Sequence, residues 1–452
     1  MTNARASART LSNVAADLPP IEWRTNPRVP QSCAAILDAL KFTTVSVRSP
    51  NWQSDADWKQ ALAFCDRSQL TLLLGSVCQN ELPPLVAQRI QRNLKANVTR
   101  LEQLKHEYRQ IAQEFEAAGV EHALLKGFTQ APCFVPDLRL RPQYDLDLWC
   151  PDAQIETARE VLAQLGFESV VEHTRFPTDH LPPMVRKTGW EWRGDYFDLE
   201  MPPVVELHFR LWDEATERFA VAGLDQFWER RGRQQVGDDT IAALHPADQF
   251  AFSALHALRH LLRGNLRALH VYEIAYFLHQ RHADPTFWEN WRELHVPELR
   301  KLQSLTCCLA RKWFGCELPP AVAAEINALR PEIRAWFESY GACAVESNFH
   351  ASKDELWLHL ALLSSPSDRL AVLRRRMIPL TLPGRVESAF VPESQRTVAR
   401  RVRGALQYAA AVASRVLYHA RSCVAVLVSG VRWRRLRREL RAPLTTRTEP
   451  RR

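Results

Sequence analysis

The sequence is short of glycine, and it lacks a run of about 18 uncharged apolar residues. Glycine accounts for only 15 of 452 residues, and runs of β-branched residues are few, so the composition favours helix. Because a membrane-spanning helix needs about 20 apolar residues, no conventional membrane span is expected. The first ten residues also lack the apolar stretch of a secretory signal.

The ten cysteines lack the spacing of a metal site. None belongs to a Cys-x-x-Cys pair, Cys307 and Cys308 are adjacent, and Cys65 and Cys78 lie in apolar surroundings. This pattern predicts reduced, buried thiols in a cytoplasmic protein, not a disulfide framework or a zinc site.

Negative charge is nearly missing from the C-terminal end. Residues 394–452 contain fifteen Arg, two Glu, no Lys and no Asp, which gives a net charge of +13. Because the whole chain carries +8, the remainder carries −5. This asymmetry predicts an Arg-rich tail, over residues 385–452, that could meet anionic partners.

Three interpretations of this tail stay open. Its arginines with Trp433, Leu436 and Leu440 could form an amphipathic helix on an anionic membrane surface, which would place the protein at the inner face of a membrane. Contact with nucleic-acid phosphates is less favoured. The third interpretation is a poorly ordered, solubilising end.

The length exceeds one ordinary core, and the pattern predicts five regions. They are a flexible N-terminus at 1–29, a helical region at 30–119, a sheet-containing core at 120–240 with an insert at 173–202, a helical domain at 241–384, and the tail at 385–452.

The longest predicted helix runs from Leu85 to Ala118, between Pro83-Pro84 and Gly119, which are typical residues at a helix start and end. Its apolar residues recur at spacings of three and four: Leu94, Val98, Leu101, Leu104, Tyr108, Ile111 and Phe115. Short strands are predicted afterwards, at 122–127, 144–149, 167–172 and 203–211, with a helix at 151–165.

Asp145 and Asp147 carry the main chemical signal. Residues two apart in a strand point to one face, so both carboxylates project together while Leu146 and Leu148 point into the core. Carboxylates held this close repel each other unless a cation lies between them, and such hard oxygen ligands suit Mg²⁺.

A third carboxylate comes from Glu206, in the alternating segment 204–208. If this strand lies beside 144–149, three carboxylates could hold two metal ions around a transferring phosphoryl group. His208 shares the face of Glu206, but a structural role is at least as consistent with its position.

Basic residues flank the carboxylates. Lys126 offers a point charge to a phosphate, Gly127 lets the backbone approach it, and Arg139 and Arg141 could bind phosphate oxygens through two hydrogen bonds each. Their placement on one strand–loop–strand unit predicts a nucleotide phosphate site.

These segments resemble the bacterial uncharacterised nucleotidyltransferase family of the polymerase-β-like superfamily. The resemblance rests on Leu-Leu-Lys-Gly (124–127), Leu-Arg-Pro-Gln-Tyr-Asp-Leu-Asp-Leu (140–148) and Val-Glu-Leu-His-Phe-Arg-Leu (205–211), with Glu-Ala-Ala-Gly-Val (116–120) and Leu-Ala-Gln-Leu-Gly-Phe (162–167). It covers about residues 120–212, and the helical flanks more loosely.

The resemblance implies an α+β fold, with a small mixed β-sheet nucleotidyltransferase core flanked by helical regions. It also implies transfer of a nucleoside monophosphate from an NTP to an acceptor with two Mg²⁺ ions. Asp145 and Asp147 match the metal-binding pair of the family, and Glu206 matches its third carboxylate. Many members of the superfamily have Gly-Gly or Gly-Ser in place of Lys126-Gly127, so this chain departs from the superfamily pattern at the phosphate site.

Two other functions stay open, namely a D-x-D glycosyltransferase using a nucleotide sugar and a non-catalytic nucleotide-binding protein. The helical character of 30–119 argues against the first, which normally has several βα units before its D-x-D. The insert is either an acceptor pocket, built with its residues His173, His180, Arg186, Lys187 and its tryptophans, or only a lid or packing loop.

Overall fold

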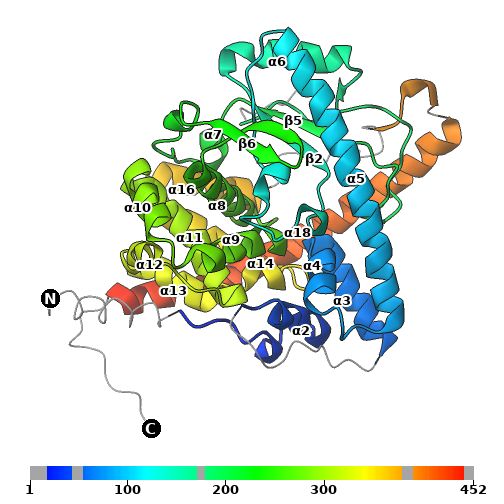
Figure 1. The fold of residues 1–452 in the computed structure, drawn as a ribbon. Coiled ribbons are helices and arrows are strands. Elements are labelled where there is room, and N and C mark those ends of the chain that lie inside the picture. The colour runs from blue at the N-terminus through cyan, green and yellow to red at the C-terminus, as the bar shows by residue number, and fades with distance from the viewer. Residues whose placement is uncertain (1–17, 43–53, 171–178, 379–389, 396, 442–452) are drawn as a thin grey trace.

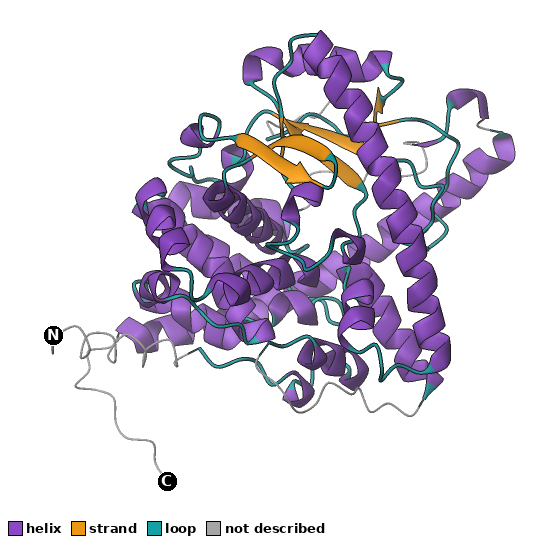
Figure 2. Cartoon of the chain, viewed as in Figure 1, coloured by secondary structure: helices purple, strands orange, loops and turns teal. Residues whose placement is uncertain are grey.

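Helices surround a single β-sheet in the computed structural model, which describes residues 18–42, 54–170, 179–378, 390–395 and 397–441 (Figure 1). The strands lie together in one part of the molecule, and the rest is helical (Figure 2). The predicted α+β fold with helical flanks is therefore confirmed.

The sheet has seven strands in the order β3-β4-β5-β2-β1-β7-β6. Strand β2 is parallel to β5, and β1 is parallel to β7, whereas the other neighbours are antiparallel, so the sheet is mixed. The strands are β1 Ala123–Leu124, β2 Asp145–Trp149, β3 Glu168–Ser169, β4 Met184–Val185, β5 Val204–His208, β6 Gly232–Val236 and β7 Asp239–Ala243.

One face of the sheet is covered by two helices, α5 (Pro84–Ala117) and α6 (Ile155–Gln164). Leu146 and Leu148 of β2 pack in the same buried cluster as Val205 and Leu207 of β5. The apolar face of α5 reaches this cluster through Leu101, Leu104, Tyr108, Ile111 and Phe115. The predicted alternation of β2 and β5 is confirmed, and it leaves their acidic residues on the opposite face.

The C-terminus of α5 shows why the chain turns there. Gly119 has a φ of +71°, and its N–H donates to the carbonyl of Glu116, while the N–H of Val120 donates to the carbonyl of Phe115. Two C-terminal carbonyls are satisfied in this way, and the chain is directed into β1.

The two predicted helical regions share one hydrophobic core. Helices α2 (Gln31–Ala39), α3 (Asp55–Ser68) and α4 (Thr71–Val77) contribute to the same buried cluster as α8 (Pro246–Arg263), α9 (Ala268–Arg281) and α11 (Pro297–Phe314). Val86 and Ile90 of α5 belong to it too, so α5 is part of both cores. The remaining helices include α7 Glu214–Glu217, α10 Pro285–Leu294, α12 Pro320–Asn327, α13 Pro331–Tyr340, α14 Cys343–Glu346, α15 Glu355–Leu362 and α16 Pro366–Met377.

Residues 18–29 differ from the flexible N-terminus that the sequence predicts. Trp23 is fully buried, and its indole N–H donates to the carbonyl of Trp313, 3.0 Å away. The N–H of Ile21 donates to the carbonyl of Lys312 at 2.7 Å. Residues 1–17 of that region lie outside the described residues.

The hairpin of β6 and β7 was not predicted. Val236 and Asp239 pair across a two-residue turn of Gly237 and Asp238. A Gly-Asp turn between two alternating segments is a recognisable hairpin signal, but the polar segment Gly-Arg-Gln-Gln at its start hides the strand pattern.

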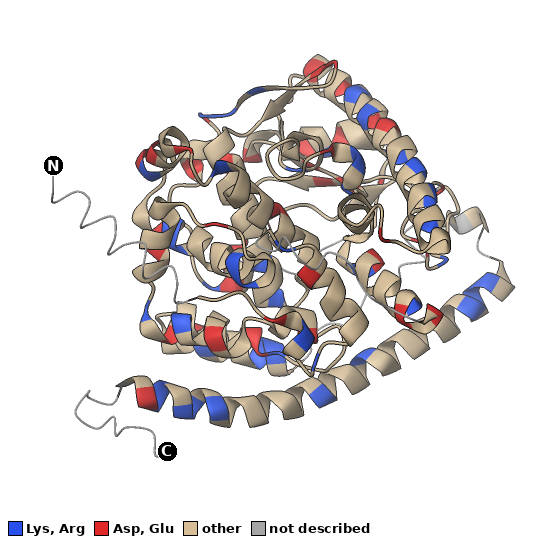
Figure 3. Ribbon diagram, turned by 60° about the horizontal axis from the view of Figure 1, so that its bottom comes forward, with Lys and Arg blue, Asp and Glu red and all other residues tan. Residues whose placement is uncertain are grey.

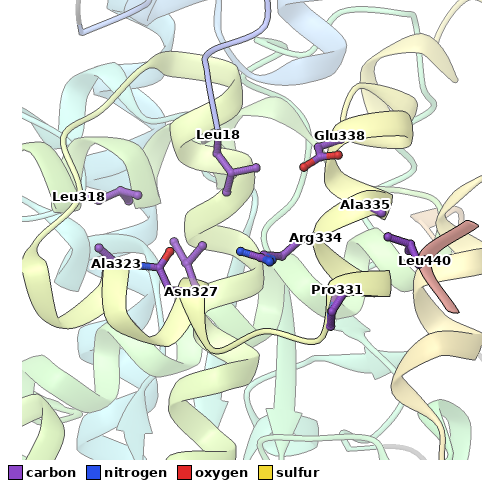
Figure 4. Close-up of a pocket in the computed structure, with 10 residues that line it drawn as sticks. Leu18, Leu318, Ala323, Asn327, Pro331, Arg334, Ala335, Glu338 and Leu440 are labelled. Carbon is purple, nitrogen blue, oxygen red and sulfur yellow. The ribbon is translucent and has the colours of Figure 1, made fainter. Parts of the chain in front are cut away.

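The C-terminal tail contains one long helix, α18 (Val398–Arg441). It is long and apolar enough to cross a membrane by length and composition alone, although Arg415 and Arg421 interrupt it, so it contains no run of about 18 uncharged apolar residues. The predicted lipid-contacting residues Trp433 and Leu440 turn toward the protein instead. Trp433 is only 3% exposed and packs on Tyr340, and Leu440 faces a pocket of about 310 Å³ between α12 and α13 (Figure 4).

Core packing predicts a large loss of stability for Leu148→Ala. Leu148 of β2 is fully buried against the helices that cover the sheet, so removing its side chain should lower the free energy of unfolding by about 2–5 kcal/mol. Leu85→Ala is the matched control, because Leu85 is 76% exposed on α5. Thermal denaturation should show a clear fall in Tm for the first variant and almost none for the second. Equal Tm values would contradict this assignment of the core.

Candidate active site

The parallel pairing of β2 and β5 sets the predicted carboxylates side by side. Asp147 lies opposite Glu206 in the register, and Asp145 lies two residues earlier on the same face. Ligand atoms of Asp147, Glu206 and His208 all lie within 4.8 Å of one another, so they could hold one metal ion. His208 therefore belongs to the site, although its sequence context left its role open.

Crowding of the three carboxylates changes their ionisation. Burial, followed by the charges of Asp147 and Asp145, raises the pKa of Glu206 to about 7. Burial and the charge of Asp147 also raise the pKa of Asp145. Without a metal ion, Glu206 is therefore partly protonated near neutral pH.

Asp147 is the exception. Burial alone would raise its pKa, but Lys126 and His208 outweigh burial and hold the pKa well below its ordinary value. The Lys126 ammonium nitrogen Nζ lies 2.9 Å from Asp147 Oδ2, and His208 Nε2 donates to Asp147 Oδ1 at 3.2 Å. Asp147 is therefore the ionised centre of the site.

A buried ion pair lies behind His208. Asp179 is 1% exposed and pairs with Arg259 of α8, and its Oδ2 lies 3.8 Å from His208 Nδ1. The backbone N–H groups of Phe209 and Arg210 donate to the Asp179 carbonyl at 3.1 Å. Asp179 thus lies beside the His208 ring without a hydrogen bond to it, whereas His208 Nε2 is hydrogen-bonded to Asp147 Oδ1. Asp179 and Arg259 carry no local sequence signal.

Three histidines lie on the other side of Lys126. Lys126 Nζ is 3.3 Å from His256 Nε2, and the ring of His256 lies 4.4 Å from that of His260 and 4.9 Å from that of His270. Burial, followed for His256 by the charge of Lys126, lowers the pKa of these imidazoles and keeps them neutral. His256 and His260 are four residues apart on α8, a spacing that the sequence did display.

Close packing around position 127 explains why this residue is glycine. Its φ is +70°, and a Cβ atom there would overlap the side-chain amide of Gln143. That amide donates to the carbonyl of Asp145 at 2.8 Å. Gly127 thus lets Gln143 hold the start of β2 and the Asp145 backbone in place.

The two predicted arginines lie in different surroundings. Arg141 is buried and its Nε lies 2.7 Å from Glu273 Oε1 of α9, yet its charge still acts on Asp145. Arg139 binds Asp137 instead, and its side chain is 64% exposed. The structure therefore brings Arg141, but not Arg139, to the carboxylates.

The insert contributes mainly to structure. The ring of His180 lies 5.1 Å from that of His208, so this residue borders the site. Arg186 pairs with Glu107 of α5, and Lys187 pairs with Glu168 of β3. His173 lies outside the described residues.

Comparison with known proteins identifies the family. The family model described as uncharacterised nucleotidyltransferase matches residues 54–315, which is more than half of the chain. The chain belongs to this nucleotidyltransferase family. No curated protein and no solved structure matches it. The family match includes β2, β5, Lys126 and the helices that supply Arg259 and His270.

The donor set of this nucleotidyltransferase fits a divalent cation. Three carboxylates converge from two strands, and burial, followed by their mutual repulsion, raises the pKa of two of them. A dication would remove that repulsion, and oxygen ligands suit Mg²⁺. His208 donates to Asp147 and so orients a ligand from behind.

The packing of Gly127 predicts a larger loss on Gly127→Ala than on Gly119→Ala. Both residues have positive φ, which costs alanine about 1–2 kcal/mol, but no atom lies within 4 Å of a Cβ at Gly119. Gly127→Ala should lower Tm further because of the overlap with Gln143. Adding Gln143→Ala should restore part of that loss. Equal losses for the two glycines would contradict the packing role.

The raised pKa of Glu206 predicts a pH-dependent penalty in metal-free protein. Between the ordinary glutamate pKa of 4.5 and about 7, the unfolded chain loses the Glu206 proton while the folded chain keeps it. The contribution of Glu206 to stability must therefore fall as pH rises through this window, and it is constant above it. In EDTA, the Tm of wild type relative to Glu206→Gln should fall from pH 5 to 7.

An exposed glutamate of α6 supplies the control for that measurement. Glu160→Gln should leave the slope of Tm against pH unchanged relative to wild type. A constant Tm difference between wild type and Glu206→Gln at all pH values would show that Glu206 is not crowded in the folded protein.

Proposed function

We propose that this protein is a metal-dependent nucleotidyltransferase that moves a nucleoside monophosphate from an NTP to a hydroxyl of a small molecule, sugar or protein. The proposal rests mainly on the parallel register that sets Asp147 beside Glu206, with Asp145 on the same face. Attack of the acceptor oxygen on the α-phosphorus forms one P–O bond and breaks the bond to pyrophosphate.

Asp145, Asp147 and Glu206 are the proposed ligands of two Mg²⁺ ions. The ions, when bound, supply charge stabilisation for the attacking and leaving oxygens. Asp147 is already ionised, so it is ready to bind a cation, whereas Glu206 must first lose its proton. His208 keeps the Asp147 carboxylate oriented.

Lys126, Gly127, Arg139 and Arg141 are the proposed phosphate-binding set. Lys126 has the strongest support, because its ammonium group already lies 2.9 Å from Asp147. A cation taken up by Asp147 would release Lys126 from this pair and leave its charge for the phosphates. Arg141 acts through its charge, whereas Arg139 would have to leave Asp137.

The alternatives have less support. A D-x-D glycosyltransferase normally has several βα units before the motif, whereas the described residues before β1 are helical. A non-catalytic nucleotide-binding protein would not need three converging carboxylates with raised pKa values at two of them.

We also propose a cytoplasmic location. All ten cysteines are free, and eight of them are buried. Burial raises the pKa of several of these thiols, which disfavours the reactive thiolate form, for example at Cys65 and Cys343. Unpaired, unreactive thiols are typical of a reducing compartment.

Ligand-induced stabilisation tests the proposed activity without knowledge of the acceptor. One NTP with Mg²⁺ should raise the Tm of wild type, because a ligand that binds only the folded state stabilises it. The effect should vanish in Asp145→Asn/Asp147→Asn. Asp152→Asn, at an exposed aspartate just after β2, is the control and should respond like wild type.

Three results would contradict the proposal in different ways. Stabilisation by a nucleotide sugar alone would support a glycosyltransferase. Mg²⁺–NTP binding without transfer of an α-labelled nucleotide to any acceptor of a cell extract would support a binding protein. Equal stabilisation of wild type and the double variant would remove the two aspartates from the site.

A further inference from the structure

Helix α18 exposes a continuous apolar stripe. At about 100° per residue, all of its exposed large apolar residues except Tyr418 fall within about 120° of the helix circumference. Their exposed fractions run from 53% to 78%, and they are Val398, Val402, Leu406, Val416, Leu417, Val424, Leu427, Val428 and Val431. Monomeric soluble proteins rarely expose so long an apolar patch without a partner.

The C-terminal half of α18 is attached to the protein by its opposite side, and one ion pair holds its N-terminal end. Tyr340 Oη donates to the Ser429 carbonyl at 3.3 Å, and Trp357 Nε1 donates to Ser429 Oγ at 3.0 Å. Further toward the N-terminus, Lys353 Nζ donates to His419 Nδ1 at 2.9 Å, and Arg400 pairs with Glu191 at 3.1 Å. The helix is therefore held on the surface with its apolar stripe facing outward.

Arginines border the stripe and continue it. Arg403, Arg421 and Arg432 are exposed and recur along one border. Beyond Val431, the same face continues with the exposed residues Arg434, Arg435 and Arg438. Figure 3 shows α18 along the outside of the molecule, with basic residues concentrated at both ends. Glu439 is the one acidic residue within Val398–Arg441.

We propose that this face of α18 lies flat on an anionic phospholipid bilayer, with the apolar stripe among the acyl chains and the arginines at the phosphates. Apolar residues beside arginines match the chemistry of such an interface. The contacts to Tyr340, Trp357 and Lys353 oppose a membrane-crossing arrangement, because crossing would break them.

A second copy of the chain fits this face less well. In an antiparallel pair of α18 helices, the arginines near Arg403 would lie against those near Arg435, and in a parallel pair each cluster would meet itself. Like charges would face each other in both arrangements. The proposal concerns location and is independent of the transfer reaction.

Vesicle sedimentation of the full chain tests this proposal. Wild type should pellet with vesicles of phosphatidylcholine plus phosphatidylglycerol, and much less with phosphatidylcholine alone. Leu406→Ser/Leu417→Ser/Leu427→Ser removes three apolar contacts without changing charge and should lower the partition coefficient by roughly 100-fold or more. Leu85→Ser/Leu370→Ser, at exposed leucines outside α18, should bind like wild type.

The charge contribution needs a separate variant. Arg434→Gln/Arg438→Gln should lower binding to the anionic vesicles by about tenfold and weaken its dependence on salt. Unchanged Tm values for all the variants would show that the fold is intact.

Four outcomes would overturn the proposal. Wild type could stay in the supernatant with anionic vesicles, or the triple serine variant could pellet as well as wild type. If bound wild type resisted extraction at high pH, α18 would be inserted into the bilayer and not bound at its surface. Self-association that the triple variant loses, without vesicle binding by wild type, would assign the face to a second copy.

Discussion

Repulsion among three carboxylates is the constraint on which the site depends. The register of two parallel strands sets Asp147 beside Glu206, and neighbouring groups offset the repulsion between their carboxylates. Lys126 and His208 hold the charge of Asp147, and Glu206 keeps a proton instead. In the metal-free site, Lys126 and the Glu206 proton thus offset the carboxylate charges. A divalent cation can replace both of them.

The sheet alone does not complete this balance. Arg259 and His256 come from α8, and Glu273, which fixes Arg141, comes from α9. Both helices belong to the larger helical core, so Lys126 is joined at the acidic face of the sheet by groups from the other core. The fold therefore makes the ionisation of the site depend on helices far along the chain from the aspartates.

The sequence predicts well those features that depend on local periodicity. Alternation identified β2 and β5, and apolar spacing with Gly119 identified α5. Features that depend on long-range packing were not predictable in this way. Asp179 looks like any loop aspartate until Arg259 lies beside it, and the pattern of α18 shows two apolar sides without showing which one docks. Trp433 was therefore assigned to the wrong side.

The long helix α5 has a mechanical consequence. Its first turns are packed in the helical core through Val86 and Ile90, whereas its last turns lie under the sheet through Ile111 and Phe115. An unbroken helix of 34 residues joins the helical core to the core under the sheet. The two cores cannot swing apart unless this helix bends. A closing motion between the two cores would therefore have to bend α5, whereas rearrangement of side chains and loops would leave the helix straight.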